Sequence, residues 1–205
     1  MRSIVCIMLC LSFWFADAQS GAVAFSALSG PEKWWVVCHP FRASKARQTT
    51  REVLHVTDSI AAVGILGKDA NGGQLDAFKH AYWMAALSER IGQKSALKLG
   101  RAHEKGNYRS FKKGRPEDGF LPDRPSSEMD LFNNAAGAAV SQWKKQWTKQ
   151  ELIGKILDMT LEGQLRVLKK EGGYFYSCDG HLLDLSELAG YWENGKCLVP
   201  SDQKQ

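Results

Sequence analysis

Three short stretches decide the fold that this chain is expected to adopt. They read DAFKHAYW at residues 76–83, GRAHE at residues 100–104 and EMDLFNNAAG at residues 128–137. Each stretch lies in a segment whose apolar residues recur every three or four positions, which is the spacing of an amphipathic helix. Each also places polar side chains on a face that would otherwise pack, namely His80, His103, Glu104, Asp130, Asn133 and Asn134. If the three helices pack with these faces inward, the side chains form one polar cluster.

Outside these stretches, the same periodicity predicts about five helices in total. The Gly106-Asn107 pair is expected to end the second of the three, and capping-box patterns begin at Ser127 and Thr148. The expected helices cover residues 41–63, 74–91, 94–105, 127–146 and 148–172, with loops at residues 64–73 and 108–125.

The two ends of the chain differ from this helical pattern. The apolar segment around WW at residues 34–35 is expected to dock on the core or to form a short strand. Residues 174–176 favour a strand, and the dipeptides DG at 179–180 and NG at 194–195 predict tight turns. The expected fold class is therefore mainly α, a single-domain helical bundle of about five helices with a small C-terminal β-hairpin region.

The first 18 residues have the features of a signal peptide. Arg2 supplies a positive charge, and residues 4–15 form an apolar run that is too short to cross a bilayer. We expect cleavage after Ala18 and an exported protein, periplasmic or extracellular; an uncleaved N-terminal anchor is the alternative. The remaining chain is expected to contain an N-terminal segment (19–40), a helical domain carrying the polar cluster (41–172) and a disulfide-stapled extension (173–205).

The cysteines fit an oxidising compartment. Cys6 and Cys10 leave with the signal peptide, so three cysteines remain. Cys178 and Cys197 flank a compact, turn-rich segment and are expected to form a disulfide, which leaves Cys38 as a buried free thiol. The sequence has no C-x-x-C pair, which argues against a structural zinc cluster.

The composition is that of a globular domain. The chain has 205 residues, of which 44% are hydrophobic and 24% charged, so one domain with a sizeable core is expected. A net charge of +5 mildly favours anionic partners, such as an anionic polymer or a lipid. No segment after the signal peptide is long and apolar enough to be expected to span a membrane.

The third stretch carries the most unusual helix face. Asp130, Asn133, Asn134 and Gly137 follow the spacing of one helical face, and asparagine is a poor residue inside helices. A pair of asparagines therefore indicates a use that offsets its cost, and Gly137 would let another helix or a ligand approach closely. A buried structural hydrogen-bond network is the alternative interpretation.

The histidines of the other two stretches have polar neighbours. Asp76 lies one turn before His80 and could fix its tautomer, as carboxylates do behind metal-bound histidines, and Trp83 indicates burial. Glu104 is expected at a helix C-terminus, where the helix dipole disfavours it, so it needs a cation, a basic partner or a chemical role. An exposed His103-Glu104 pair is the alternative.

These motifs together resemble an uncharacterised family of secreted bacterial proteins, with related domains at the ends of some large toxin-like proteins. The resemblance covers residues 74–140, with residues 34–35 as a weaker part. It implies a mostly helical fold with a His/His-Glu/Asp/Asn-Asn site and no settled activity. The family often has Asn in place of Asp76 and Arg in place of Lys79.

The first function that this pattern predicts is that of a hydrolase-like enzyme. A divalent metal ion could be held by His80, His103 and Asp130, with Glu104 as general base. Asn133 and Asn134 would then orient the substrate or stabilise an oxyanion. A metal-free variant would use His103 as the base. The expected substrate is an extracellular or envelope polymer, a lipid or a phosphodiester.

Two other functions are weighed against an enzyme. A non-catalytic binding or structural protein would use the polar cluster to hold three helices in register. A toxin-like nuclease would use the basic residues between Lys98 and Arg115, but Glu117 and Asp118 follow directly and make nucleic-acid binding the weaker hypothesis. The sequence leaves the metal, the substrate and the oligomeric state open.

Overall fold

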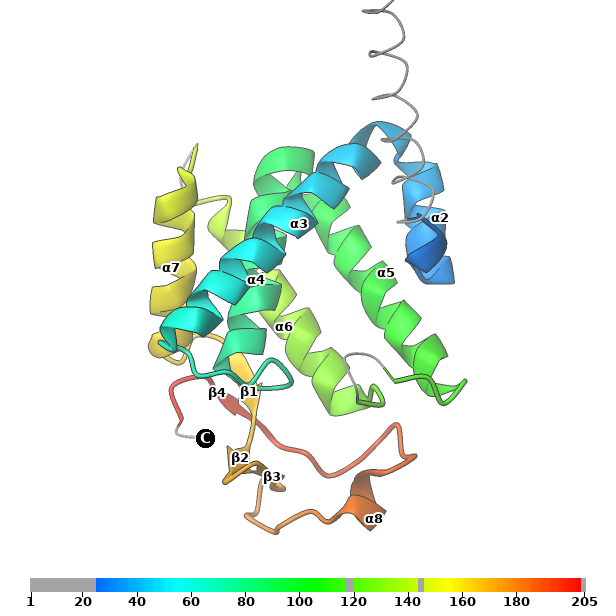
Figure 1. Cartoon of the computed structure of the whole chain (residues 1–205), viewed down its shortest axis with the longest axis vertical. Helices are drawn as coiled ribbons and strands as arrows, with labels where there is room; N and C mark the ends of the chain where they lie inside the picture. Colours follow the sequence, from blue (N-terminus) through cyan, green and yellow to red (C-terminus); the bar gives the residue numbers. More distant parts are fainter. Residues whose placement is uncertain (1–24, 117–119, 144–145, 204–205) are drawn as a thin grey trace, which may run out of the picture.

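The computed structural model describes residues 25–116, 120–143 and 146–203. Within them the chain is mainly helical and ends in a small antiparallel strand region, as the sequence predicts (Figure 1). These residues contain seven helices, so the expected number of about five is too low. They are α2 (Gly30–Cys38), α3 (Pro40–Val63), α4 (Gln74–Ile91), α5 (Gln93–Phe111), α6 (Arg124–Val140), α7 (Lys149–Leu161) and α8 (Leu185–Leu188).

Helices α2 and α8 account for the difference in number. α2 forms where the sequence predicts a docked segment or a strand, because Ser29 and Glu32 make a reciprocal capping box and Pro31 lies in the first turn. The helix is fixed to the core through Trp35, whose buried indole N–H donates to the carbonyl of Ser95 at 3.1 Å. α8 is a single turn of four residues in the C-terminal segment.

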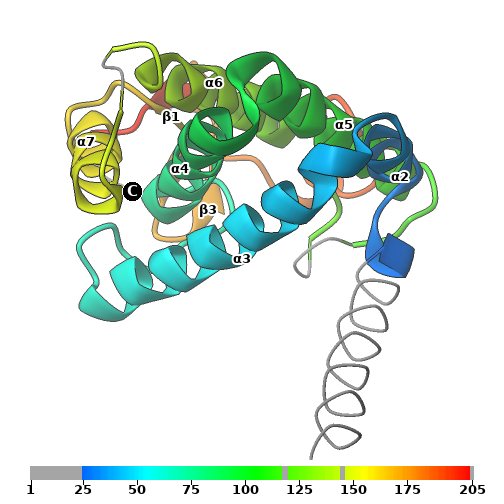
Figure 2. The same ribbon diagram turned by 90° about the horizontal axis from the view of Figure 1, so that it is seen from above.

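Helix α4 is the centre of the bundle and packs against α3, α5, α6 and α7 (Figures 1 and 2). Leu75, Phe78 and Leu87 point in different directions around α4, and all three are buried. A helix that is apolar around its circumference lies inside a protein, and α4 satisfies this rule. The polar residues Asp76 and His80 on α4 are therefore buried as well.

Helices α4 and α6 cross at a glycine contact, as the sequence predicts for Gly137. A Cβ atom on Gly137 would lie 1.9 Å from the backbone oxygen of Ala81, which no side chain can tolerate. This close approach brings the face of α6 that carries Asp130 and Asn134 against the face of α4 that carries His80. The polar cluster expected from the sequence therefore depends on one missing Cβ atom.

Helix α5 is longer than predicted and continues through Gly106 and Asn107 to Phe111. Gly106 does not end the helix, because it packs against the start of α2: a Cβ atom there would lie 2.5 Å from the Ser29 hydroxyl oxygen. A tertiary contact thus outweighs the helix-ending tendency of glycine. As a consequence, Glu104 lies in the interior of a helix and is buried.

The bounds of α6 and α7 also differ from the prediction. α6 begins at Arg124, because Asp123 is its N-cap and accepts a hydrogen bond from the backbone N–H of Ser126 at 2.9 Å. α7 ends at Leu161 instead of continuing to residue 172. The chain turns at Gly163, which has a φ of 74°, and then forms a strand.

The strands lie at one end of the bundle (Figure 1). β1 (Arg166–Leu168) pairs antiparallel with β4 (Leu198–Pro200), and β2 (Lys170–Glu171) pairs antiparallel with β3 (Tyr174–Phe175). Gly172 and Gly173 form the turn between β2 and β3. The expected start of the C-terminal extension at residue 173 therefore falls inside a hairpin.

The disulfide between Cys178 and Cys197 is present as predicted. Cys38 is free but exposed, so the prediction of a buried thiol is wrong. The reason is that α2 turns Trp35 toward the core and leaves Cys38 on the outer face. The predicted signal peptide lies outside the described residues. None of the helices described here has both the length and the apolarity to cross a membrane.

Candidate functional site

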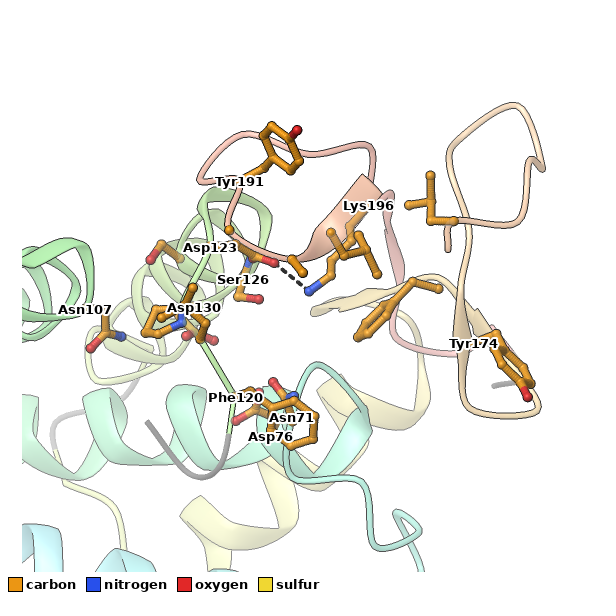
Figure 3. Close-up of a pocket in the computed structure, with 18 of the residues that line it drawn as sticks. Asn71, Asp76, Asn107, Phe120, Asp123, Ser126, Asp130, Tyr174, Tyr191 and Lys196 are labelled. Carbon is orange, nitrogen blue, oxygen red and sulfur yellow. Dashed lines mark hydrogen bonds and ion pairs between the residues drawn. The ribbon is translucent and has the colours of Figure 1, made fainter. Parts of the chain in front are cut away.

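A cavity of about 990 Å³ lies between the helical bundle and the C-terminal segment (Figure 3). The helices supply a polar floor, and the loop before α6 and the segment from residue 173 to residue 196 supply a largely apolar roof. The polar floor consists of Asp76, Lys79, His80, His103, Asn107 and Asp130, and the roof includes Phe120, Phe175, Leu183 and Tyr191.

Three residues of the floor, Asp76, His80 and Asp130, converge and are called here the Asp–His–Asp cluster. The Nε2 atom of His80 lies 3.6 Å from Asp76 Oδ1 and 3.4 Å from Asp130 Oδ1. All three side chains are buried, and one potential ligand atom of each lies within 4.8 Å of the others. The cluster therefore joins two elements, because Asp76 and His80 belong to α4 and Asp130 belongs to α6.

The contacts of His80 with the two carboxylates are longer than charge-assisted hydrogen bonds. Charge-assisted N–H···O hydrogen bonds are about 2.7–2.9 Å long, so both contacts of His80 are too long for that geometry. Ligand atoms about 2.0–2.2 Å from a zinc ion are separated from one another by about 3.3–3.5 Å in a tetrahedral arrangement. The two distances from His80 are close to this value.

His80 is held in its neutral form. Burial lowers its pKa well below the usual 6.5, and the positive charges of Lys79 and His103 lower it further. An interaction with the side chain of Asn134 opposes this shift but does not reverse it. Neutral imidazole is the form that binds a metal ion, so the site provides the ligand in the required state.

Asp76 has its own fixed environment at the start of α4. One carboxylate oxygen accepts from the backbone N–H of Gly72 at 2.7 Å, and the other lies 2.8 Å from the ammonium group of Lys79. Lys79 can balance only one of the two carboxylates in the Asp–His–Asp cluster.

His103 lines the same cavity but is not part of the cluster. Its Nδ1 atom lies 3.1 Å from the carboxylate of Glu32 on α2, and its ring centre is 6.4 Å from that of His80. The predicted metal set of His80, His103 and Asp130 is therefore not the one that converges. Asp76, for which the sequence predicts a supporting role, is the third member of the cluster.

The Glu32 carboxylate is strongly stabilised in its charged form. Burial alone would raise its pKa, but the hydrogen bond and charge of His103 outweigh this effect. Hydrogen bonds from Ser29 act in the same direction, and the pKa falls from 4.5 to about 2. Glu32 therefore holds His103 through its Nδ1 atom.

The two asparagines have different surroundings. Both amide atoms of Asn133 bond to the backbone of Arg166, at 2.9 Å each, and so attach β1 to α6. Asn133 is thus occupied away from the cavity, and the catalytic role predicted for it has no support in this geometry. Asn134 lies behind His80, and within the described residues neither of its buried amide atoms has a partner in regular hydrogen-bond geometry.

Glu104 does not line the main cavity. It lines a neighbouring groove between α2, α5 and α6, and its Oε2 atom accepts from the side-chain amide of Asn107 at 3.2 Å. Asn107 does line the main cavity. Glu104 therefore contacts a residue of the main cavity without lining that cavity, and this geometry gives no support to its predicted role as general base.

The roof of the cavity is fastened to the N-terminus of α6. Lys196 forms an ion pair with Asp123 at 2.5 Å (Figure 3). Asn194 donates to the same carboxylate oxygen at 2.9 Å. Burial would raise the pKa of Asp123, but the charge and hydrogen bond of Lys196 lower it on balance. One carboxylate thus caps α6 and also holds the C-terminal segment.

Sequence reasoning missed Glu32, Lys196 and Asp123. The S-x-x-E pattern at residues 29–32 is a capping-box signal that could have predicted α2. The contact of Glu32 with His103 joins residues 71 positions apart in the sequence, and the pair of Lys196 with Asp123 joins residues 73 positions apart. No local pattern can reveal contacts at such a separation.

The helical part of this site lies within a segment that matches a protein family of unknown activity. Comparison with curated proteins and with solved structures gives no significant match. A family model described as a domain of unknown function, DUF6973, matches residues 33–164. This range is more than half of the chain and includes the whole Asp–His–Asp cluster and His103. The chain belongs to this uncharacterised family, the DUF6973 domain proteins.

Proposed function

We propose that the protein is a metal-dependent hydrolase that acts in the cavity beneath the C-terminal segment. The observation that carries this proposal is the convergence of Asp76, His80 and Asp130, from two helices, on the floor of a cavity of substrate size. Clusters of buried titratable groups in a cleft are preferred sites of catalysis. The Cys178–Cys197 disulfide is consistent with a periplasmic or extracellular location, which we propose as well.

The donor atoms restrict the choice of metal. Two carboxylate oxygens and one imidazole nitrogen suit zinc, manganese or iron better than calcium, which prefers oxygen ligands alone. A divalent ion held there would supply Lewis-acid polarisation of the scissile carbonyl or phosphoryl group. Asp76, His80 and Asp130 would hold such an ion and would leave room for water and substrate, as the protein ligands of catalytic zinc sites do.

His103 is the group that we assign to proton transfer. In the neutral form of His103, with its Nδ1–H donating to Glu32, Nε2 carries the lone pair and can take a proton from the attacking water. The water oxygen forms a bond to the substrate centre, the bond to the leaving oxygen breaks, and the proton passes from His103 to that oxygen. A histidine oriented by a carboxylate in this way recurs in unrelated hydrolases.

A structural role for the cluster is the second candidate, and one observation favours it. Asp76 already accepts from Gly72 and pairs with Lys79, so part of its charge is satisfied within the protein. Under this alternative, the cluster would fix the register of α4 and α6, and no metal would bind.

Metal binding and thermal stability distinguish the two candidates. We expect purified protein to contain a divalent metal, and readdition after chelation should raise the melting temperature of the wild type. Asp130→Asn should abolish this rise and abolish hydrolysis of ester or phosphodiester substrates. Asp158→Asn, at an exposed position on α7, is the matched control and should behave like the wild type.

The melting temperature of the metal-free protein separates the two candidates further. Without metal, Asp130→Asn removes one of two crowded buried carboxylates and should not lower the melting temperature. A purely structural cluster predicts the reverse, a loss of stability in Asp130→Asn that is the same with and without metal. That result, together with no bound metal, would rule out the proposed function.

A further inference from the structure

A second cavity of about 790 Å³ lies between α2, α3, α4 and α5, on the side of the site away from the C-terminal segment. Its lining is mostly apolar and includes Trp35, Val36, Val53, Leu54, Trp83 and Leu99. Its size falls in the range of cavities that hold small organic ligands. Among the residues described, no side chain fills this space.

This second cavity meets the first one at the catalytic side chains. Lys79, His80 and His103 line both cavities. A ligand in the second cavity would therefore extend to His80 and His103, where the first cavity begins. The indole rings of Trp35 and Trp83 are fixed in its wall by hydrogen bonds. The N–H of Trp35 donates to the carbonyl of Ser95, and the N–H of Trp83 donates to the hydroxyl of Thr50.

The charged lining of the second cavity is mainly basic. Arg47 and Arg51 come from α3; Lys79 comes from α4 and is already paired with Asp76. The acidic residue Glu32 is already engaged with His103 and Ser29. An apolar cavity with this excess of positive charge is complementary to a hydrocarbon chain that ends in an anionic group.

We propose that the second cavity holds the hydrocarbon chain of the substrate and that the substrate is an anionic amphiphile, a lipid with a hydrolysable ester or phosphoester. This inference rests on the proposed function, since it places the scissile group beside His103 and the Asp–His–Asp cluster. The hydrocarbon chain occupies the second cavity, and the polar part of the lipid meets Lys79, His80 and His103, the side chains that line both cavities.

Quenching of tryptophan fluorescence tests this inference without any measurement of catalysis. The probe is a long-chain fatty acid that carries bromine near the end of its chain, titrated below its micelle concentration. We expect saturable quenching, because the brominated chain would contact Trp35 and Trp83. Trp83→Phe should reduce the amplitude of quenching while leaving the midpoint of the titration nearly unchanged.

Two variants of α3 identify where the hydrocarbon chain of the probe binds. Leu54 lines the cavity and is 49% exposed, so Leu54→Asp places a charge at the lining with little damage to the core. Affinity for the probe should fall by about tenfold or more. Val63→Asp is the matched control, since Val63 is 70% exposed on the same helix and lies outside the cavity lining. Its affinity should equal that of the wild type.

The outcomes separate this inference from the proposed function. Absence of saturable quenching, or equal weakening by Leu54→Asp and Val63→Asp, would overturn the chain-binding cavity even if metal-dependent hydrolysis of short esters is found. Retention of probe binding in Asp130→Asn is expected, because this change affects the metal ligands and not the cavity. Probe binding without any metal-dependent hydrolysis would support the cavity and refute the catalytic proposal.

Discussion

At the scale of single residues, Glu32 contributes to the site in two ways. Its carboxylate completes the capping box of α2 and also holds His103 from a distance of 71 residues along the chain. Its pKa of about 2 is lower than the ordinary 4.5, because His103 and Ser29 stabilise the charged form more than burial disfavours it. The charge of Glu32 is therefore linked to the stability of the fold.

Glu32→Gln should reveal this linkage as a dependence of stability on pH. The folded-state pKa is depressed, so the stabilisation by the charge is present above pH 4.5 and is lost as the pH falls toward 2. Glutamine also serves in capping boxes, so the variant should lose the charge but keep the cap. At pH 6 we expect its free energy of unfolding to be lower by up to about 3 kcal/mol.

Urea unfolding from pH 6 down to pH 2 provides the measurement. The difference between wild type and Glu32→Gln should shrink as Glu32 becomes protonated in the wild type. A difference that stays constant over this range would show that the charge of Glu32 is not the stabilising feature. Glu162→Gln, at an exposed position after α7, should differ little from the wild type at any of these pH values.

Individual residues also show the limit of sequence reasoning. Helical spacing places Asp76 and His80 on one face of a helix, and it places Asp130 and Asn134 on one face of another. It does not show which neighbour each face meets. For this reason His80 and Asp130 were predicted correctly to meet, but the third member of the cluster is Asp76 and not His103.

At the scale of helices, the position of the site depends on how closely α4 and α6 approach. Gly137→Ala would place a Cβ atom 1.9 Å from the Ala81 backbone oxygen, which cannot move without displacing α4. We expect the unfolding free energy to fall by roughly 3 kcal/mol or more, at the upper end of overpacking effects. Metal affinity should fall as well, because Asp130 moves away from His80.

Gly154→Ala is the matched control for this change. Gly154 lies inside α7, and a Cβ atom there would meet no other atom within 4 Å. Alanine should raise stability by up to about 1 kcal/mol through its higher helix propensity. Thermal unfolding and metal titration of both variants test the argument; similar behaviour of the two would mean that the close contact at Gly137 is not required.

The helices also differ in how well their bounds follow from local sequence. α4 was predicted with its observed bounds, because Gly73 and Gly92 stand directly outside them and the residues between are good helix formers. α5 was predicted too short, because Gly106 serves the contact with Ser29 and does not end the helix. Local signals define an element well only where no distant segment gives the same residue a different use.

At the scale of the whole molecule, the chemistry and the enclosure of the site come from different parts of the chain. The family match ends at residue 164 and includes the Asp–His–Asp cluster, whereas the roof of the cavity comes from residues 173–196. The sequence predicted the disulfide of the later segment but not its position over the site. That position depends on the ion pair between Lys196 and Asp123, which no local pattern reveals.

Loss of the disulfide should therefore loosen the roof and leave the helices intact. Between β3 and β4 the segment is held by the Cys178–Cys197 bond, by the Tyr176–Leu182 bridge and by the Lys196–Asp123 pair next to the disulfide. In the double variant Cys178→Ser/Cys197→Ser, this segment loses the constraint that closes it, which is worth about 3 kcal/mol in the chain-entropy account. The helical core does not contain this loop, so the helical circular dichroism signal should persist.

Limited trypsin digestion followed by mass spectrometry measures the effect directly. Cleavage after Lys196 should become faster in the double variant, because this lysine is buried against Asp123 only while the segment is closed. Cys38→Ser is the control, since Cys38 is exposed and free, and its digestion pattern should match the wild type. Equal cleavage in all three proteins would mean that the ion pair and the strands hold the roof without the disulfide, and that the cavity stays closed in its absence.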